Sequence, residues 1–320
     1  MYKKILAIWV LCFLTSFAIA QEKKPMTWQD IPTWKYMQGA SFEVSPDGQW
    51  IAYGMVALEA DGEVILQKVN DPESKKTFKI GSTNFPSIEF SKDSKWMAFK
   101  EYPTFSEKKA NEKSKGKPLR DKLILLELGK EEKKTFENVS SFSFNGDAST
   151  HLAINLAKEG NGDAKGSDLL IYHLKSEKAQ NMGNVSEFSF NKSGTHLAYV
   201  VDAANKSGNG VYLMNLASNS TAILDSDKAS YQSLNWTEKG EAFAALKMVE
   251  DKKYKQDHGK VIGVKNLNNP QVTVYDAQKD STGFDQSYTI SGNQRPMWSE
   301  DLTRLFYGIR PLVLAKKEEP

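Results

Sequence analysis

Cysteine is nearly absent from this chain, which has one cysteine, Cys12, among 320 residues. Cys12 lies in the first twenty residues, which have the pattern of a leader that is removed on export. Without that leader the chain has no cysteine, and this excludes a disulfide bond, a thiol nucleophile and a thiolate metal site. An exported protein of this length without disulfides must be stabilised by its apolar core.

The expected leader occupies residues 1–20. Lys3 and Lys4 precede an apolar run at residues 5–17, and Ala-Ile-Ala follows at residues 18–20. This order is typical of a secretory signal peptide that is cleaved after its last alanine. A membrane anchor is the alternative, but the run is shorter than the roughly 20 apolar residues that span a bilayer. We therefore predict an exported protein, periplasmic or extracellular, with no stable membrane anchor after cleavage.

The common motifs of hydrolytic and nucleotide chemistry are missing as well. The sequence has no Gly-x-Ser-x-Gly nucleophile elbow, no His-Glu-x-x-His zinc motif, no phosphate-binding glycine-rich loop and no EF-hand loop. The formal net charge is only +2, so no global charge attracts the chain to nucleic acid. We predict no catalytic residue, no cofactor, no metal ligand and no nucleic-acid partner.

What the sequence does contain is a repeat. FSFNKSGTHLAYV, which starts at Phe188, has five counterparts along the chain. They are FEVSPDGQWIAYG, IEFSKDSKWMAFK, FSFNGDASTHLAIN, LNWTEKGEAFAAL and PMWSEDLTRLFYG. In each copy a large apolar residue, the anchor, precedes a polar turn, and successive anchors are 46, 54, 46, 46 and 62 residues apart. The anchors are Val44, Phe90, Phe144, Phe190, Trp236 and Trp298.

Each copy has the features of a β-hairpin. In Ser-Pro-Asp-Gly (residues 45–48), proline presets the first turn position, the aspartate side chain can bond the backbone ahead, and glycine supplies positive φ. The strand after the turn carries alanine at its centre, as in Ile51-Ala52-Tyr53, which indicates a closely packed neighbour.

Further β-rich runs follow each hairpin. We expect third strands at residues 64–69, 123–128, 169–174, 211–216 and 272–275, each followed by a weaker polar strand. Four strands in about 46 to 50 residues correspond to the blade of a β-propeller. Helical periodicity is missing, apart from a possible turn near residues 27–37. We predict an all-β chain: a lead-in at residues 21–40 and a β-propeller at residues 41–320.

Only five of the expected blades are complete, because the sixth copy is followed by just twelve residues. A propeller closes with roughly four to eight whole blades, and a half blade leaves open strand edges. Either the segment before Phe42 supplies the missing strands, or the chain is a truncated piece of a longer propeller of seven or eight blades. We favour truncation and expect poor solubility of the isolated piece.

The repeat also bears on the histidines. His151 and His196 lie at a position that other copies fill with Trp50, Trp96, Ala242 and Arg304. A position that accepts these residue types is structural, so neither histidine is a catalytic candidate. We expect His173 on the surface of a strand and His258 in a solvated loop.

The recurrent turn aspartates have two interpretations, calcium binding or capping of the turn backbone. They are Asp47, Asp93, Asp147 and Asp301. Each turn lacks the cluster of oxygen ligands that calcium needs, so we predict turn capping.

Two lysine-rich segments, residues 101–120 and 247–265, are expected as loops between the second and third strands of their blades. Acidic residues are mixed into both, unlike the basic and aromatic surfaces that bind nucleic acid. We interpret them as solvated loops that can contact a partner or gate a substrate. Trp236 and Trp298 are anchors and belong to the core, whereas Trp28 and Trp34 can fasten the lead-in to the propeller or to another domain.

Together these motifs resemble one family. WQDI (residues 28–31) and Trp34-Lys35, followed by the first hairpin, resemble the start of exported bacterial serine peptidases of the prolyl oligopeptidase family. EADGE (residues 59–63) and the sixth copy fit the same group, especially its long forms from Bacteroidota. The resemblance covers the N-terminal propeller only, and Tol-associated propellers share the Ser-Pro-Asp-Gly turn.

The resemblance implies a propeller that caps a C-terminal α/β-hydrolase domain and restricts entry to short peptides. The hydrolase domain carries the Ser, Asp and His of the triad, and none of those positions exists here, so the chain alone should be inactive. The alternative is a complete periplasmic propeller of the Tol-associated type that binds a protein or an envelope component. A propeller enzyme with its own funnel site has no supporting motif.

Overall fold

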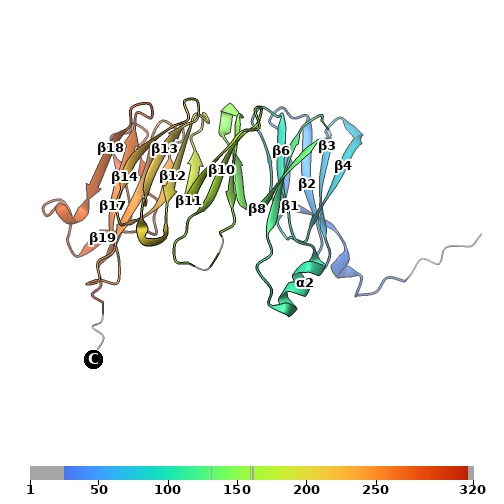
Figure 1. Cartoon of the computed structure of the whole chain (residues 1–320), viewed down its shortest axis with the longest axis horizontal. Coiled ribbons are helices and arrows are strands. Elements are labelled where there is room, and N and C mark those ends of the chain that lie inside the picture. Colours follow the sequence, from blue (N-terminus) through green and yellow to red (C-terminus); the bar gives the residue numbers. More distant parts are fainter. Residues whose placement is uncertain (1–24, 131, 159, 161, 316–320) are drawn as a thin grey trace, which may run out of the picture.

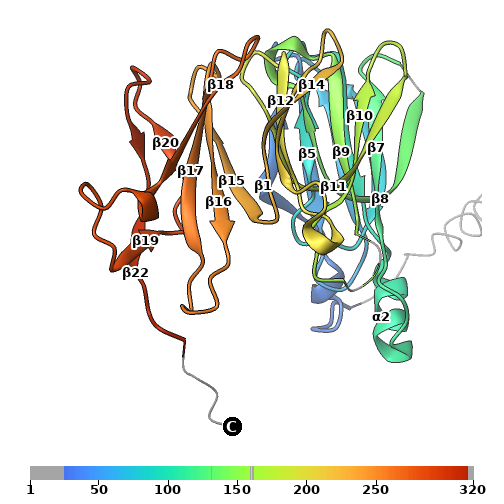
Figure 2. The same cartoon turned by 60° about the vertical axis from the view of Figure 1, so that its left-hand side comes forward.

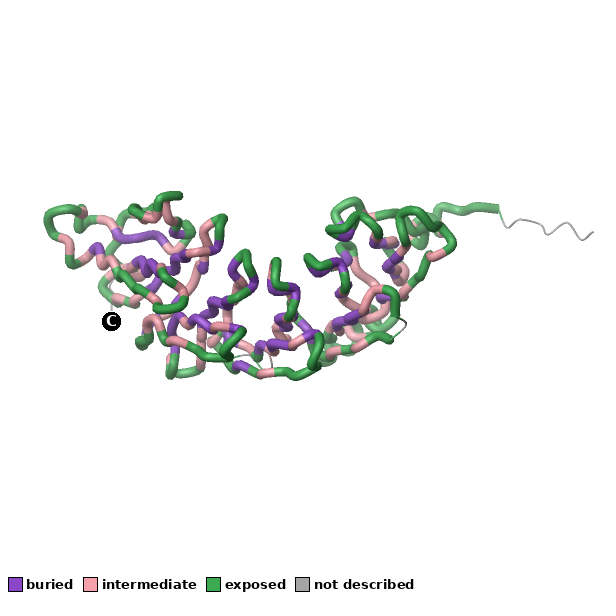
Figure 3. The backbone as a smooth tube through the Cα atoms, turned by 90° about the horizontal axis from the view of Figure 1, so that it is seen from above, coloured by how far each residue is buried: buried purple, intermediate pink, exposed green. Residues whose placement is uncertain are grey.

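The computed structural model describes residues 25–130, 132–158, 160 and 162–315. The predicted signal peptide and Cys12 lie outside the described residues. Within them, strands predominate and form blades that lie side by side in an open arc (Figures 1 and 3). The predicted all-β architecture of propeller blades is confirmed. No helix in these ranges combines the length and the apolar composition that crossing a bilayer requires.

Five four-stranded antiparallel blades follow one another, each with its strands in sequence order. Blade 1 contains β1 (Tyr36–Val44), β2 (Trp50–Val56), β3 (Gly62–Lys68) and β4 (Asp71–Gly81). Blade 2 contains β5 (Ile88–Phe90), β6 (Trp96–Glu101), β7 (Asp121–Glu127) and the first half of β8 (Lys133–Phe144). Blade 3 contains the second half of β8, β9 (His151–Leu156), β10 (Ser167–His173) and the first half of β11 (Ala179–Phe190).

Blade 4 contains the second half of β11, β12 (His196–Val201), β13 (Gly210–Asn215) and β14 (Ser220–Ser226). Blade 5 contains β15 (Ser230–Trp236), β16 (Phe243–Val249), β17 (His258–Lys265) and β18 (Gln271–Asp276). Blade 6 is a hairpin in which β19 (Tyr288–Ile290) and β20 (Met297–Trp298) run against β22 (Ile309–Pro311) and β21 (Leu305–Phe306). Short 3-10 helices lie at Ile31–Thr33, Gly146–Ala148, Ala204–Lys206 and Ala277–Lys279.

The core is divided into five apolar layers, one between each pair of neighbouring blades. The layer between blades 1 and 2 illustrates the arrangement: Val64 and Leu66 of β3 meet Met97 and Phe99 of β6. The other four layers join blades 2 and 3, 3 and 4, 4 and 5, and 5 and 6 in the same way. Each of blades 2 to 5 therefore buries its two faces against two different neighbours. We call the face toward the next blade the forward face and the opposite one the backward face.

The central alanine of the second strand is buried in every complete blade, as its small size predicted. Ala52, Ala98, Ala153, Ala198 and Ala244 are all 0% exposed. In blades 1 to 4 this alanine belongs to the layer shared with the following blade. An alanine here lets the inner strands of adjacent blades approach, because interiors are close-packed and leave no room for a larger side chain.

The turns between first and second strands also join neighbouring blades. The Asp47 N–H donates to Ser94 Oγ, and the Asp93 N–H donates to Ser149 Oγ, each at a distance of 3.0 Å. Gly194 has φ of 71°, and a Cβ there would stand 1.6 Å from the Asn145 carbonyl oxygen. Glycine is thus required at that turn by both conformation and close approach.

The structure corrects the prediction of loops at residues 101–120 and 247–265, and it shows where the first strand begins. The third strand of blade 5 is β17, within the segment expected as a loop, and residues 272–275 belong to the fourth strand. Lysines interrupt β17, yet Val261, Ile262 and Val264 are fully buried. A helix, α2 (Phe105–Ser114), lies in the other segment that was expected as a loop. β1 already begins within the expected lead-in.

We predict that Ala198→Phe destabilises the fold, because the added ring has no space in the layer between blades 4 and 5. Overpacking of this kind costs about 1–3 kcal/mol. Phe306 lies at the equivalent position of blade 6 and is 51% exposed, so the control Phe306→Ala should change stability by no more than about 0.5 kcal/mol. Urea unfolding followed by tryptophan fluorescence measures both, and equal effects would contradict the layered packing.

Candidate functional site

One rim of the arc carries the longest connections of the chain. The loops between second and third strands of blades 2 to 5 project there, and so does the lead-in (Figures 1 and 2). These loops include α2, the described part of residues 157–166, residues 202–209 and residues 250–257. We call this rim the loop face. The opposite rim carries the short Ser-Pro-Asp-Gly type turns, so the loop face offers more varied side chains for binding.

Helix α2 stands on the loop face and is held at its first turn. Thr104 caps the helix: its hydroxyl accepts from the Glu107 N–H, and the Glu107 carboxylate accepts from the Thr104 N–H at 2.8 Å. Asp61, in the equivalent loop of blade 1, accepts from the Phe105 N–H at 2.7 Å. No residue of α2 is buried. Phe105, Lys108 and Asn111 are partly buried and the other residues of the helix are exposed, so the exposed side of α2 is available for contact with another surface.

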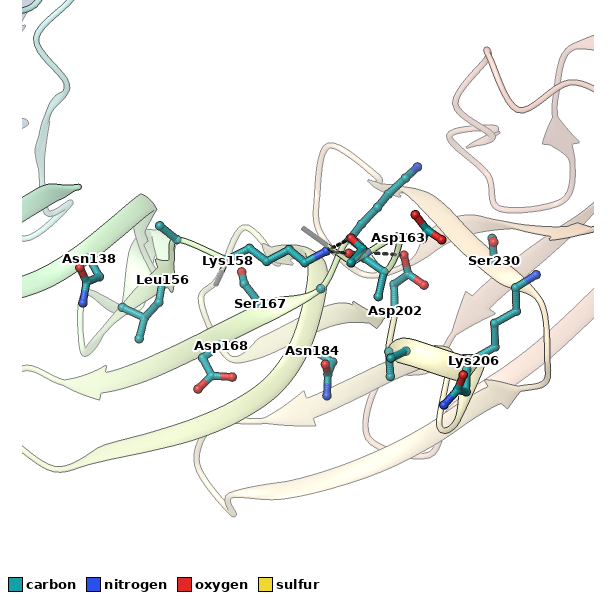
Figure 4. A pocket seen from close by; sticks show the side chains of 18 residues that line it. Asn138, Leu156, Lys158, Asp163, Ser167, Asp168, Asn184, Asp202, Lys206 and Ser230 are labelled. Carbon is teal, nitrogen blue, oxygen red and sulfur yellow. Dashed lines mark hydrogen bonds between the residues drawn. The ribbon is translucent and has the colours of Figure 1, made fainter. Parts of the chain in front are cut away.

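A cavity of about 800 Å³ lies between the loops of blades 3 and 4 (Figure 4). Its lining includes Lys158, Asp163, Asp202 and Lys206. The Asp202 carboxylate accepts from the Lys165 N–H at 2.9 Å and from the Asn209 amide at 3.1 Å, and the Lys158 ammonium donates to carbonyl oxygens of its own loop. These bonds hold the two loops in shape, and the cavity suits a polar ligand.

The inner wall of the arc has a recess of about 420 Å³ that spans blades 1 to 3. Glu43 and Glu89 lie in its lining. The Glu89 carboxylate accepts from the Phe144 N–H at 3.1 Å and thus joins the innermost strands of blades 2 and 3. Burial, aided by the nearby negative charge of Glu43, raises the pKa of Glu89 to about 7.

The four histidines lie apart from the cavity and the recess. His151 is half-buried and its ring stands edge-on to that of His173, 4.7 Å away between centroids. Burial first, and then the neighbouring His173, lowers the pKa of His151 to about 4. His196 is 5% exposed, and burial lowers its pKa. These positions agree with a structural role for His151 and His196.

His258 differs from its prediction as a solvated loop residue. It begins β17, its side chain is only 15% exposed, and its Nε2 lies 3.0 Å from the Asp251 carboxylate. The expectation failed because Asp251 is seven residues away in the sequence and only the fold of the loop brings it close. The contact fastens one end of the loop at residues 250–257.

The turn aspartates cap backbone N–H groups in three of the four predicted positions. Asp47, Asp93 and Asp301 accept from the N–H two residues ahead at 3.0, 3.2 and 3.1 Å. In the third copy, which has an extra residue, Asn145 takes this role and accepts from the Thr150 and His151 N–H groups. Among the residues placed by the structure, no three His, Cys, Asp or Glu side chains gather as a metal site would require.

The predicted core tryptophans are partly buried. Trp236 packs against the layer between blades 4 and 5, and the Trp298 indole donates to the Phe243 carbonyl oxygen at 2.9 Å. Trp28 and Trp34 of the lead-in behave differently, since they are 77% and 49% exposed. They do not fasten the lead-in to the propeller.

No family model matches the sequence, and no curated protein does either. Among solved structures, the β-propeller domain of the Trilobed protease from Pyrococcus furiosus is similar, with 14% identity and a TM-score of 0.42 over 87% of this chain and 84% of that one. A structure from a study of two prolyl endopeptidases has 10% identity and a TM-score of 0.43 over 85% of this chain and 46% of that one.

TolB from Acinetobacter baumannii has 14% identity and a TM-score of 0.34 over 73% of this chain and 53% of that one. The chain thus spans about half the length of the prolyl endopeptidase and of TolB. Likenesses as distant as these carry no inference about activity.

The raised pKa of Glu89 predicts a stability difference that depends on pH. As pH rises from about 4.5 to 7, the unfolded chain loses this proton before the folded one, so folding becomes less favourable. Glu89→Gln should therefore stabilise the fold at pH 8, by about 1–3 kcal/mol, and have little effect at pH 4.5. Urea unfolding at both pH values measures this. A stabilisation that is equal at both would contradict it. Glu112→Gln, at an exposed position of helix α2, is the control and should change stability little at either pH.

Proposed function

We propose that this chain is the non-catalytic, substrate-gating propeller portion of an exported serine peptidase of the prolyl oligopeptidase type. Further sequence would contribute the missing blades and an α/β-hydrolase domain with the catalytic triad. Export rests on the leader pattern at residues 1–20. Short peptides are the substrates in this proposal, and they would reach the hydrolase domain past the loops and the inner wall of the propeller.

The observation that carries the proposal is the exposure of Trp28 and Trp34. Both belong to the lead-in motif that resembles the peptidase family, and they are 77% and 49% exposed. The described part of the lead-in lies on the loop face (Figure 2). Met26, which precedes Trp28, and Ile31, which lies between the two tryptophans in sequence, are also exposed. A cluster of large apolar side chains on a surface usually marks a contact with another protein unit. A hydrolase domain on the loop face would cover them.

The geometry of the loop face fits a gating role. Helix α2 and the polar cavity between blades 3 and 4 lie on the same rim as the lead-in. A domain that covers this rim would enclose the cavity, and peptides would then pass side chains of alternating charge such as Lys158, Asp163 and Lys206. Long or folded chains would be excluded by size.

The reading frame past codon 320 tests the proposal directly. We expect further blade repeats, then a Gly-x-Ser-x-Gly elbow followed by Asp and His. In the longer product, Trp28→Ser combined with Trp34→Ser should lower peptidase activity, since the domain contact loses two apolar side chains of a type that often dominates interfaces. A genuine stop codon at this point would contradict the proposal.

A second function has one observation in its favour, the exposed and basic character of the α2 segment. Residues 106–120 contain six basic and two acidic side chains, and no residue of α2 is fully buried. A complete periplasmic propeller that binds a protein or an envelope component could use this segment as its contact.

Deleting residues 108–117 tests that function. If the chain is a binding propeller, capture of envelope components by the immobilised protein should fall strongly. The unfolding midpoint should change little, because no residue of α2 is buried. Replacing Lys252, Lys253 and Lys255 by serine, in the loop of blade 5, is the matched control. Unchanged capture after the deletion would argue against this function.

A further inference from the structure

The innermost strand of each blade has backbone groups that point away from its own sheet. In blade 4, the residue after the anchor bonds the second strand: the Asn191 N–H donates to the His196 carbonyl oxygen at 3.0 Å. Backbone groups alternate in direction along an antiparallel strand, so the N–H of the anchor Phe190 points away from the second strand. Such a group needs an acceptor from outside the sheet.

Glutamates of the preceding blade supply that acceptor at two junctions. Glu89 of blade 2 accepts from the N–H of the blade 3 anchor, Phe144, at 3.1 Å. Glu187 of blade 4 accepts from the Ser233 and Leu234 N–H groups of blade 5, both at 3.0 Å. In each case a carboxylate on the innermost strand of one blade bonds the innermost strand of the next.

The junction between blades 3 and 4 lacks such a carboxylate. Blade 3 has Ser143 at the position of Glu89 and Ser141 at the position of Glu187. The Ser143 hydroxyl donates to the carbonyl oxygen of the next residue at 3.2 Å and is too short to replace a glutamate. In the part of the chain that the structure describes, no acceptor meets the Phe190 N–H.

A recess of about 440 Å³ opens in the inner wall at this junction. Its lining includes Ser143 and two lysines, Lys92 from the turn of blade 2 and Lys192 from the turn of blade 4. Both lysines are exposed, and neither forms an ion pair with a described residue. Asp147 is the single acidic residue of the lining, so positive charge prevails in the recess.

One side of the recess is apolar. The rings of Phe188 and Phe190, both in the lining, are only partly buried. Phe144, the equivalent anchor of blade 3, is 4% exposed. A ligand with an apolar group beside its charge would cover the two rings.

We propose that this recess binds a carboxylate attached to a large apolar group, as at the C-terminus of a peptide that ends in phenylalanine. The carboxylate accepts from the Phe190 N–H, as Glu89 accepts from the N–H of blade 3, and Lys92 and Lys192 balance its charge. An acidic side chain next to an apolar one offers the same chemistry. The inference is independent of the proposed function, because binding to the propeller is measured without peptidase activity.

Calorimetric titration of the 320-residue chain with N-acetyl-Ala-Phe tests the inference. The free acid should bind one to one, and its C-terminal amide should bind about tenfold more weakly or less, because it lacks the charge-assisted bond. N-acetyl-Glu-Phe-amide separates the two sources of the carboxylate. Affinity equal to that of the free acid assigns the recess to acidic side chains, and weaker affinity assigns it to chain ends.

Substitutions in the lining give the decisive comparison. Lys92→Gln combined with Lys192→Gln should lower the affinity for the free acid about fivefold, since two partly solvated ionic contacts are lost. Lys239→Gln is the matched control, because Lys239 is exposed in the corresponding turn of blade 5 and lies outside the recess. Its affinity should be unchanged.

Ser143→Glu places a carboxylate of the chain itself where blade 2 has Glu89. This variant should keep a cooperative unfolding transition and lose binding of the free acid, because its own side chain occupies the Phe190 N–H. The inference is overturned if the acid and the amide bind equally, or if the acid does not bind at millimolar concentration. It is also overturned if the double lysine variant binds as the control does, or if folded Ser143→Glu binds as the unchanged chain does.

Discussion

The contact between the faces of neighbouring blades is the interaction on which this structure depends. A single four-stranded sheet of this kind has two apolar faces and cannot bury either of them alone. Stacking blades around an arc buries both faces of every inner blade, and small residues such as Ala98 and Ala198 set how closely the inner strands approach. The loops gain their positions from this stack, because each is tied to two strands that the layers hold in place.

Sequence reasoning reached the blades because the repeat places the anchor, the turn and the central alanine at fixed spacing. It failed where one segment carried mixed signals. Lysines interrupt the buried valines of β17 (His258–Lys265), which hid a strand, while α2 has a capping box at Thr104 and Glu107 but no apolar face. The cavity between blades 3 and 4 was out of reach, since two loops from separate repeats form it and their backbone bonds decide its shape.

The functional features follow the same division between stack and rim. Side chains of the inner wall and of the short turns form hydrogen bonds between neighbouring blades. Glu89 accepts from the Phe144 N–H, and Ser94 accepts from the Asp47 N–H. The loop face carries large side chains that the described chain leaves exposed, above all Trp28 and Trp34. The sequence left two roles open for Trp28 and Trp34: attachment of the lead-in to the propeller, or attachment to another domain. Their exposure in the fold argues against the first role.

The central claim is that packing between the faces of neighbouring blades stabilises the described chain. Hydrogen–deuterium exchange on the chain tests it most directly. Backbone amides of β12, β13 and β16, which lie between two covered faces, should exchange slowest, and protection should fall toward β1–β2 and toward β20–β21. Uniform protection from end to end would contradict the account.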